Sequence, residues 1–238
     1  MWYNIGRGEI MAKRISVIIT AAGSSSRMGI STNKIFLDLC GISVIERTIN
    51  AFVDIPEVVE IILVTKKEFF KDFEKIINKI SLDIKLVEGG SSREESTFNG
   101  LLNVSNFSDF VLCHDGARPL ISKSVILNVI NELNGYDAVI TGVRSKDTMK
   151  FVSSELEVIS TPDRRSLFNI QTPQAFRKNI ILDGYKKFFS ENFFVTDDSS
   201  IVENLGIKVK LVEGEYSNIK ITTMEDVFYA RELLERGI

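Results

Sequence analysis

The sequence has very few of the residues that build most metal centres and disulfides. Its 238 residues include two cysteines and one histidine. Cys40 and Cys113 are far apart and belong to no Cys-x-x-Cys motif, which argues against a thiolate zinc site and favours a reducing compartment. His114 alone is a thin basis for a metal site, and a lone histidine beside a strand is more often structural than catalytic. We therefore expect a cytoplasmic protein whose chemistry does not need His114.

Long apolar runs and an excess of positive charge are also missing. No apolar run approaches the roughly 20 residues that cross a bilayer. Residues 1–12 lack the apolar core of a secretory signal and are interpreted as a loose extension, with Met11 as an alternative start. The net charge of -3 argues against a broad nucleic-acid surface, so an anion site must be locally basic. We expect neither a membrane nor a nucleic acid as a partner.

An apolar strand that runs into a loop of small residues is the most informative segment present. Residues 15–29 read ISVIITAAGSSSRMG, and Lys34 follows closely. Small residues let backbone N–H groups approach phosphate oxygens, and Arg27 and Lys34 can neutralise the remaining charge. The loop is not a Walker A motif, and it lacks the Gly-x-Gly of the dinucleotide fingerprint. It predicts a phosphate site without naming a reaction.

Strand and helix patterns alternate along most of the chain. With 44% hydrophobic and 26% charged residues, the chain can bury a substantial α/β core. The alternation predicts a mostly parallel sheet covered on both faces, with ligands at the carboxyl ends of its strands. The predicted strands are 15–19, 58–64, 84–87, 110–113, 138–143 and 208–212. The predicted helices are 43–53, 67–80, 92–104, 124–133, 178–189 and 197–205, and a last one opens at a capping box, Thr222 to Glu225.

The alternation breaks between residues 145 and 168. Segments 147–152 and 156–161 look like two strands around a polar turn, with no helix between them. A lone hairpin cannot bury both of its faces, so we interpret it as an arm that packs on a second subunit. The simplest organisation is an extension over 1–13 and one domain over 14–238 that includes the arm.

Four charged segments could carry chemistry. Asp115 and Arg118 follow a buried strand and fit a site for Mg²⁺-bound phosphates and a second anion, although a simple turn is the alternative. Residues 163–165 and 218–222 could be solvated charge. Residues 196–200 look like a helix start capped by Thr196, and capping alone would explain them.

Taken in order, these motifs resemble the cytidylyltransferase family of the methylerythritol phosphate route to isoprenoids. The resemblance runs from about residue 15 to the C-terminus. The matching motifs are Ala21-Ala-Gly with Arg27-Met-Gly and Lys34, Gly89-Gly with Arg93 and Ser96, His114-Asp-Gly-Ala-Arg-Pro119, Asp147-Thr-Met-Lys150, Asp163-Arg164, Gln171-Thr-Pro-Gln174, Thr196-Asp197, and Val212-Glu-Gly with Asn218-Ile-Lys-Ile-Thr222.

The resemblance implies a Rossmann-like nucleotidyltransferase fold and a homodimer that joins CTP to methylerythritol phosphate with Mg²⁺, releasing diphosphate. It implies that Arg27 and Lys34 stabilise the transition state, and that Arg164 and Lys220 position the substrate phosphate. No residue is assigned as a metal ligand, and Asp115 is a candidate. The resemblance assigns the cytosine nucleotide to Ala21, Ala22, Gly23, Gly90 and Ser96, and the methylerythritol pocket to Asp115, Arg118, Thr148, Thr172 and Thr196. Thr148 and Arg164 lie on the arm and would serve the partner's site.

The sequence departs from the family motifs at two places, and two other functions are alternatives. The family often has Pro-Lys-Gln where this chain has Asn33-Lys-Ile35, and an acidic residue where it has Ser91. The lysine is retained, so the departures concern loop rigidity and nucleotide contacts. The rivals are a ribitol-5-phosphate cytidylyltransferase, whose first loop usually reads Leu-Ala-Gly-Gly, and a nucleotide-binding protein without turnover.

Overall fold

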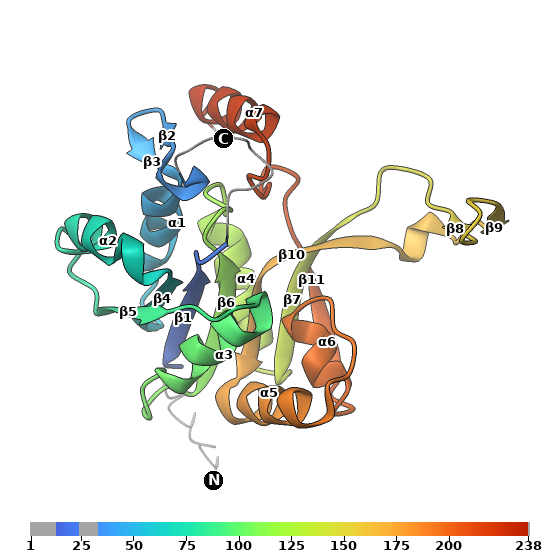
Figure 1. The fold of residues 1–238 in the computed structure, drawn as a ribbon, viewed down its shortest axis with the longest axis horizontal. Helices are drawn as coiled ribbons and strands as arrows, with labels where there is room; N and C mark the ends of the chain where they lie inside the picture. Colours follow the sequence, from blue (N-terminus) through green and yellow to red (C-terminus); the bar gives the residue numbers. More distant parts are fainter. Residues whose placement is uncertain (1–12, 24–32, 238) are drawn as a thin grey trace, which may run out of the picture.

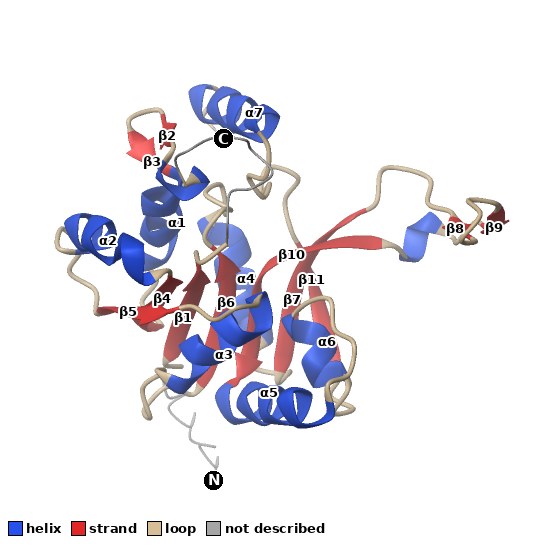
Figure 2. Ribbon diagram, in the orientation of Figure 1, coloured by secondary structure: helices blue, strands red, loops and turns tan. Residues whose placement is uncertain are grey.

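A seven-stranded sheet forms the centre of the molecule (Figures 1 and 2). The computed structural model describes residues 13–23 and 33–237. Residues 1–12 of the predicted extension, Arg27 and the rest of residues 24–32 lie outside this part. The strands of the sheet are β1 (Ile15–Thr20), β4 (Val58–Thr65), β5 (Ile84–Glu88), β6 (Phe110–Asp115), β7 (Ala138–Arg144), β10 (Phe168–Arg177) and β11 (Val209–Glu213).

The strand order is β11-β7-β10-β6-β1-β4-β5. β1 pairs in parallel with β4 and β6, β4 with β5, and β11 with β7, while β10 is antiparallel to both of its neighbours. The mostly parallel sheet is therefore confirmed. β10 was not predicted from the sequence, because Pro173 interrupts its pattern. Proline cannot donate to a ladder, and the register with β7 shifts between Gln171 and Gln174.

Helices cover both faces of the sheet, as expected. The helices are α1 (Val44–Val53), α2 (Phe70–Ile77), α3 (Arg93–Leu102), α4 (Lys123–Glu132), α5 (Lys178–Glu191), α6 (Asp198–Glu203) and α7 (Met224–Glu235), with short 3-10 turns η2 (Lys34–Phe36), η3 (Lys67–Phe69) and η4 (Arg164–Ser166). One face of the sheet packs on α1, α2 and α4 in a core with Val17, Ile49 and Val129. The other face packs on α3, α5 and α6 in a core with Ile18, Tyr185 and Ile201. Strand side chains alternate between faces, so neighbours such as Val17 and Ile18 enter different cores.

A third, smaller core lies beyond the carboxyl edge of the sheet. It joins α7 to a short hairpin of β2 (Asp38–Leu39) and β3 (Ile42–Ser43) through buried Leu39, Ile221 and Val227. None of the helices in the described part of the chain is long and apolar enough to span a membrane.

Two predicted helix caps are displaced by one residue. Thr223, not Thr222, caps α7 and forms a capping box with Asp226. Asp197, not Thr196, caps α6 by accepting from the backbone of Ser200. In both places the chosen cap is the residue whose side chain reaches the third backbone N–H of the helix, and neighbouring Thr and Asp residues made the sequence ambiguous.

The predicted hairpin protrudes from the body as an arm, which we define as residues 145–168 (Figure 1). Its strands, β8 (Phe151–Val152) and β9 (Val158–Ser160), pair antiparallel and are shorter than predicted. Phe151, Leu156 and Ile159 are exposed. The arm thus carries large apolar side chains on a segment that the body does not cover.

Candidate active site

A cavity of about 590 Å³ opens at the carboxyl edge of the sheet. Its walls come from the ends of β1 and β6, the turn η2, the start of α3 and the segment before α7. The lining residues are Thr20, Ala21, Ala22, Gly23, Lys34, Ile35, Lys66, Gly90, Ser91, Ser92, Arg93, Ser96, Asp115, Ala117 and Lys220. Eight of the predicted site residues, from five separate segments, are among them: Ala21, Ala22, Gly23, Lys34, Gly90, Ser96, Asp115 and Lys220.

One wall is built from small residues that pack closely. A Cβ added to Gly89 would lie 2.5 Å from the Cβ of Ala22, so the two loops approach as closely as they do because a glycine stands there. The Gly90 N–H donates to Ser96 Oγ at 3.0 Å, and that hydroxyl donates to the carbonyl of Ser92 at 2.8 Å. This wall therefore presents short side chains to a ligand, and hydrogen bonds through Ser96 fix its backbone.

Two lysines also line the cavity. Lys34 Nζ donates to the carbonyl of Ile221 at 2.7 Å, and Lys220 Nζ donates to Asp115 Oδ1 at 2.9 Å. The bond from Lys34 therefore reaches the residue next to Lys220, although the two lysines are far apart in sequence. Both ammonium groups lie at one cavity, which makes it locally basic in a chain of net negative charge.

Asp115 is the buried anchor of these charges. Arg118 Nε donates to its Oδ2 at 3.0 Å, and Arg118 also donates to the carbonyl of Asn218 at 2.8 Å. Burial alone would raise the pKa of Asp115, but the charges of Lys220 and Arg118 outweigh it and hold that pKa well below its usual range. A carboxylate that is ionised near pH 7 thus holds two cations at the cavity edge.

A hydrogen-bond chain continues from Asp115 into the core. The Asp115 N–H donates to Thr172 Oγ1 at 3.0 Å, which leaves that hydroxyl to donate to His114 Nδ1 at 3.1 Å. His114 Nε2 then donates to the carbonyl of Arg118 at 3.2 Å. Burial lowers the pKa of His114 to about 4, so the ring is neutral near pH 7. These contacts fit the structural role expected for His114, and they place Thr172 behind Asp115, outside the cavity lining.

Arg93 is a site residue to which sequence reasoning assigned no role. It lines the cavity from the first turn of α3 and bonds Asp198 Oδ2 at 2.9 Å, while Tyr185 donates its hydroxyl to Asp198 Oδ1 at 2.6 Å. The Asp198 carboxylate is buried, and the charge of Asp198 raises the pKa of Arg93. Arg93 belongs to one of the sequence motifs, but its partner Asp198 lies 105 positions away. The sequence therefore could not predict this ion pair.

Besides Thr172, four predicted site residues lie outside this cavity lining. Thr148 and Arg164 are exposed on the arm, where Arg164 donates to the carbonyl of Lys146 at 3.2 Å. Arg118 is turned toward Asp115 and Asn218, and Thr196 is exposed just before α6. A single subunit therefore does not bring the arm residues to the cavity described here.

These features define a Rossmann-like nucleotidyltransferase fold with a basic cavity at the carboxyl edge of its sheet. The chain belongs to a particular family of that class. The family model described as 2-C-methyl-D-erythritol 4-phosphate cytidylyltransferase matches residues 15–236.

Individual relatives agree with this assignment. The 2-C-methyl-D-erythritol 4-phosphate cytidylyltransferase of Caldanaerobacter subterraneus subsp. tengcongensis is 43% identical over 225 residues, which cover 93% of this chain and 99% of that protein. The crystal structure of 4-diphosphocytidyl-2C-methyl-D-erythritol synthase from Anaerococcus prevotii is similar with a TM-score of 0.86 and 43% identity, covering 94% of this chain and 99% of that one. A Thermus thermophilus structure titled 2-C-methyl-D-erythritol 4-phosphate cytidylyltransferase has a TM-score of 0.77 at 27% identity, covering 93% and 99%.

Proposed function

We propose that this chain transfers CMP from CTP to 2-C-methyl-D-erythritol 4-phosphate, giving 4-diphosphocytidyl-2-C-methyl-D-erythritol and diphosphate in isoprenoid precursor biosynthesis. The observation that carries the proposal is the match to the family over residues 15–236, together with the Lys34, Lys220 and Asp115 side chains at one cavity. The rival ribitol-5-phosphate cytidylyltransferase is disfavoured, because the family and the relatives are named for methylerythritol phosphate.

The proposed reaction is an in-line displacement at the α-phosphorus of CTP. An oxygen of the substrate phosphate forms the new bond to that phosphorus, and the bond to the oxygen that bridges to the β-phosphorus breaks, releasing diphosphate. A phosphate monoester is largely ionised at neutral pH, with a second pKa of about 6, so no general base is required. The neutral, hydrogen-bonded His114 is consistent with a mechanism of this kind.

The protein then contributes by positioning the two substrates and by stabilising the charge that develops in the transition state. We assign Lys34 and Arg27 to the negative charge that develops on the α-phosphate, and Lys220 and Arg164 to the substrate phosphate. Arg27 lies outside the described residues, so its part rests on the motif alone. The small-residue wall of Ala21, Ala22, Gly23, Gly90 and Ser96 is assigned to the cytosine nucleotide.

Mg²⁺ fits this site as an ion that arrives with the triphosphate. No group of three His, Cys, Asp or Glu side chains that could hold a metal occurs among residues 13–23 and 33–237. Asp115 is the carboxylate of the cavity, and its oxygens already accept from Lys220 and Arg118. A bound Mg²⁺ would take most of its ligands from CTP and would neutralise phosphate charge there.

A homodimer completes the proposed site. The exposed apolar residues of the arm need a second surface, and Thr148 and Arg164 lie on that arm, away from their own cavity. We infer that the arm brings both residues to the partner's substrate, where they join Asp115, Arg118, Thr172 and Thr196. One domain over 14–238 and a cytoplasmic location stay predictions. The two free cysteines fit that location.

Diphosphate release tests the proposal directly. The purified protein is incubated with CTP, Mg²⁺ and either 2-C-methyl-D-erythritol 4-phosphate or ribitol 5-phosphate. We expect turnover with the first substrate and little with the second. Turnover with ribitol 5-phosphate alone would assign the rival activity, and no turnover with either would favour a nucleotide-binding protein.

A further inference from the structure

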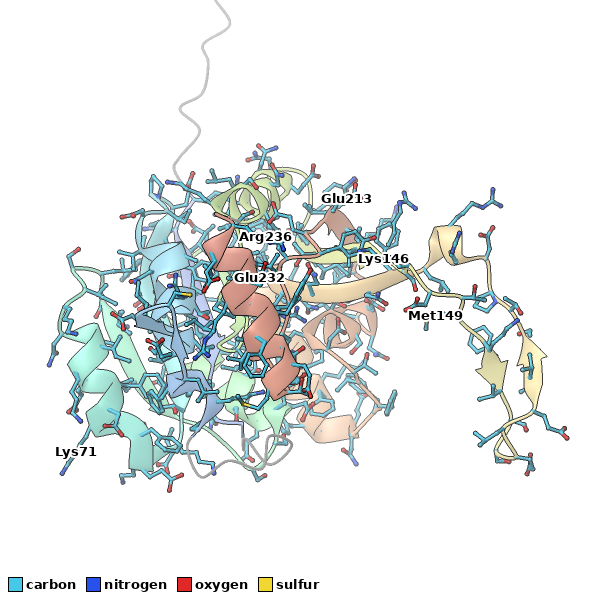
Figure 3. All side chains as sticks on the ribbon, turned by 90° about the horizontal axis from the view of Figure 1, so that it is seen from above. Lys71, Lys146, Met149, Glu213, Glu232 and Arg236 are labelled. Carbon is cyan, nitrogen blue, oxygen red and sulfur yellow. The ribbon has the colours of Figure 1, made fainter. Side chains whose placement is uncertain are left out.

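Tyr216 contacts residues 144–146, where the arm leaves the body, and we call this segment the arm root. Tyr216 lies in the connection between β11 and α7, and the residue is 45% exposed. Its hydroxyl donates to the carbonyl of Arg144, the last residue of β7, at 2.8 Å. Lys146 Nζ lies 3.6 Å from the centre of its ring, in a cation–π contact. Figure 3 shows Lys146 where the arm leaves the body.

The outgoing and returning segments of the arm are also bonded to each other near Lys146. The Ser145 N–H donates to the carbonyl of Leu167 at 3.0 Å, which joins the outgoing and returning segments of the arm. Arg164 donates to the carbonyl of Lys146 at 3.2 Å. Lys146 thus contacts both Tyr216 and Arg164, which is the arm cation assigned to the substrate phosphate.

The other end of the same connection is fixed at the cavity. Gln171 Nε2 donates to the carbonyl of Glu215 at 2.9 Å, and Asn218 Nδ2 donates to the carbonyl of Thr172 at 2.9 Å. Lys220 then bonds Asp115. Tyr216 thus projects toward the arm from a segment that is held on both sides by the edge of the sheet.

We propose that Tyr216 is a positioning residue that sets the direction of the arm, and through it the place where Thr148 and Arg164 meet the partner's substrate. This inference rests on the proposed function, because it requires the arm to serve the other subunit. A two-strand connection by itself can bend at its root. The ring and hydroxyl of Tyr216 fix that root by packing and by one directional bond.

Substitution of Tyr216 tests the effect on each substrate. Loss of a cation–π contact and a hydrogen bond is expected to lower kcat/KM for methylerythritol phosphate about tenfold in Tyr216→Ala, with the KM for CTP unchanged. Tyr216→Phe keeps the ring and is expected to lose about threefold. The matched control is Tyr136→Ala. Tyr136 is 37% exposed and faces Lys210 at 5.5 Å, but it precedes β7 at the opposite end from the arm. We expect wild-type kinetics for it.

Mixed dimers separate a role in the partner's site from a role in the residue's own site. Heterodimers of Tyr216→Ala with Lys34→Ala are isolated through two affinity tags. Their one working site belongs to the Tyr216→Ala subunit but receives an arm with intact Tyr216. We expect the wild-type kcat/KM for methylerythritol phosphate at that site. A kcat/KM equal to that of the Tyr216→Ala homodimer would overturn the inference and place the effect within one subunit.

A parallel heterodimer of Arg164→Ala with Lys34→Ala tests the proposed function itself. If this pair recovers the wild-type kcat/KM for methylerythritol phosphate and the Tyr216→Ala pair does not, the arm serves the partner but Tyr216 does not direct it. If neither pair recovers, the proposed assignment of the arm to the partner fails, and the inference fails with it. Equal kcat/KM in Tyr216→Ala, Tyr216→Phe and wild type would also overturn the inference.

Discussion

Two buried carboxylates at opposite ends of the same sheet have similar partners and different surroundings. At the amino end, Glu60 of β4 accepts from Lys85 at 2.6 Å and from Ser16 at 2.5 Å. At the carboxyl end, Asp115 of β6 accepts from Lys220 and Arg118. Each carboxylate is buried and each has a lysine partner that reaches solvent.

The difference lies in what surrounds the ion pairs. Ser105 also donates to both oxygens of Glu60, through its N–H and its hydroxyl, at 2.7 Å. Glu60 thus joins β1, β5 and the segment after α3 at the amino end of the sheet. Asp115 instead borders a cavity of about 590 Å³ that also contains Lys34 and Arg93. An ion pair is therefore not itself the sign of a site, since the open space and the additional cations distinguish the functional end.

The largest expected effect is on turnover at the open end. Lys34→Ala removes a cation from the proposed transition-state contacts, and kcat is expected to fall by about 100-fold or more. CTP still binds, because the wall of small residues is untouched. Steady-state kinetics and calorimetric titration with CTP measure the two quantities. A near-normal kcat would refute the role given to Lys34.

Glu60→Gln is expected to affect stability and leave catalysis alone. Loss of the buried charge weakens the bonds from Lys85, Ser16 and Ser105, at a cost of about 3 kcal/mol in the free energy of unfolding. Urea denaturation measures it. Asp115→Asn is the counterpart at the open end, where we expect a large loss of kcat/KM for methylerythritol phosphate. A change in the KM for CTP or for methylerythritol phosphate in Glu60→Gln would contradict a purely structural role for Glu60.

Low pH is also expected to destabilise the amino end of the sheet, where Glu60 lies. Burial raises the pKa of Glu60, but its hydrogen bonds, above all that from Lys85, outweigh burial and lower the pKa from 4.5 to about 2. The stabilisation is therefore fully present above pH 4.5 and is lost as the pH falls toward 2. Near pH 3 the wild type is expected to have lost about 2 kcal/mol through this group. Urea denaturation of the wild type and of Glu60→Gln across this range gives that contribution. Parallel pH curves for the two proteins would contradict the shift.

The smallest effect is expected for Arg164, which is bonded to the Lys146 carbonyl and not to Glu60 or Asp115. Its exposed guanidinium donates to a backbone carbonyl of the arm, so its loss leaves no buried charge unpaired. We expect Arg164→Ala to raise the KM for methylerythritol phosphate about tenfold without lowering stability. Initial rates at varied sugar phosphate, together with thermal unfolding, measure both. A lower melting temperature with an unchanged KM would give Arg164 a structural role.

Local patterns predicted most elements of the fold. The six predicted strands are present, and Ser43 and Ser92 cap α1 and α3 as their motifs indicate. The motifs also led to the family and its activity, which the comparisons confirm. β10 was missed because its pairing depends on two strands distant in sequence, which tolerate Pro173 at a register shift. The roles of Arg27, Arg164 and the residues of the methylerythritol pocket stay predictions.

The sequence by itself determined the alternation of strands and helices, the small-residue loop after β1 and the protruding arm, because each depends on neighbouring residues. Only the tertiary structure decided which charges meet. Asp115 finds Lys220 and Arg93 finds Asp198 across 105 positions in each case, and Tyr216 meets the arm root 72 positions away. Such pairs form because the fold brings the ends of strands and helices that are distant in sequence close together. The energy of each pair then depends on burial and direction, which no local pattern contains.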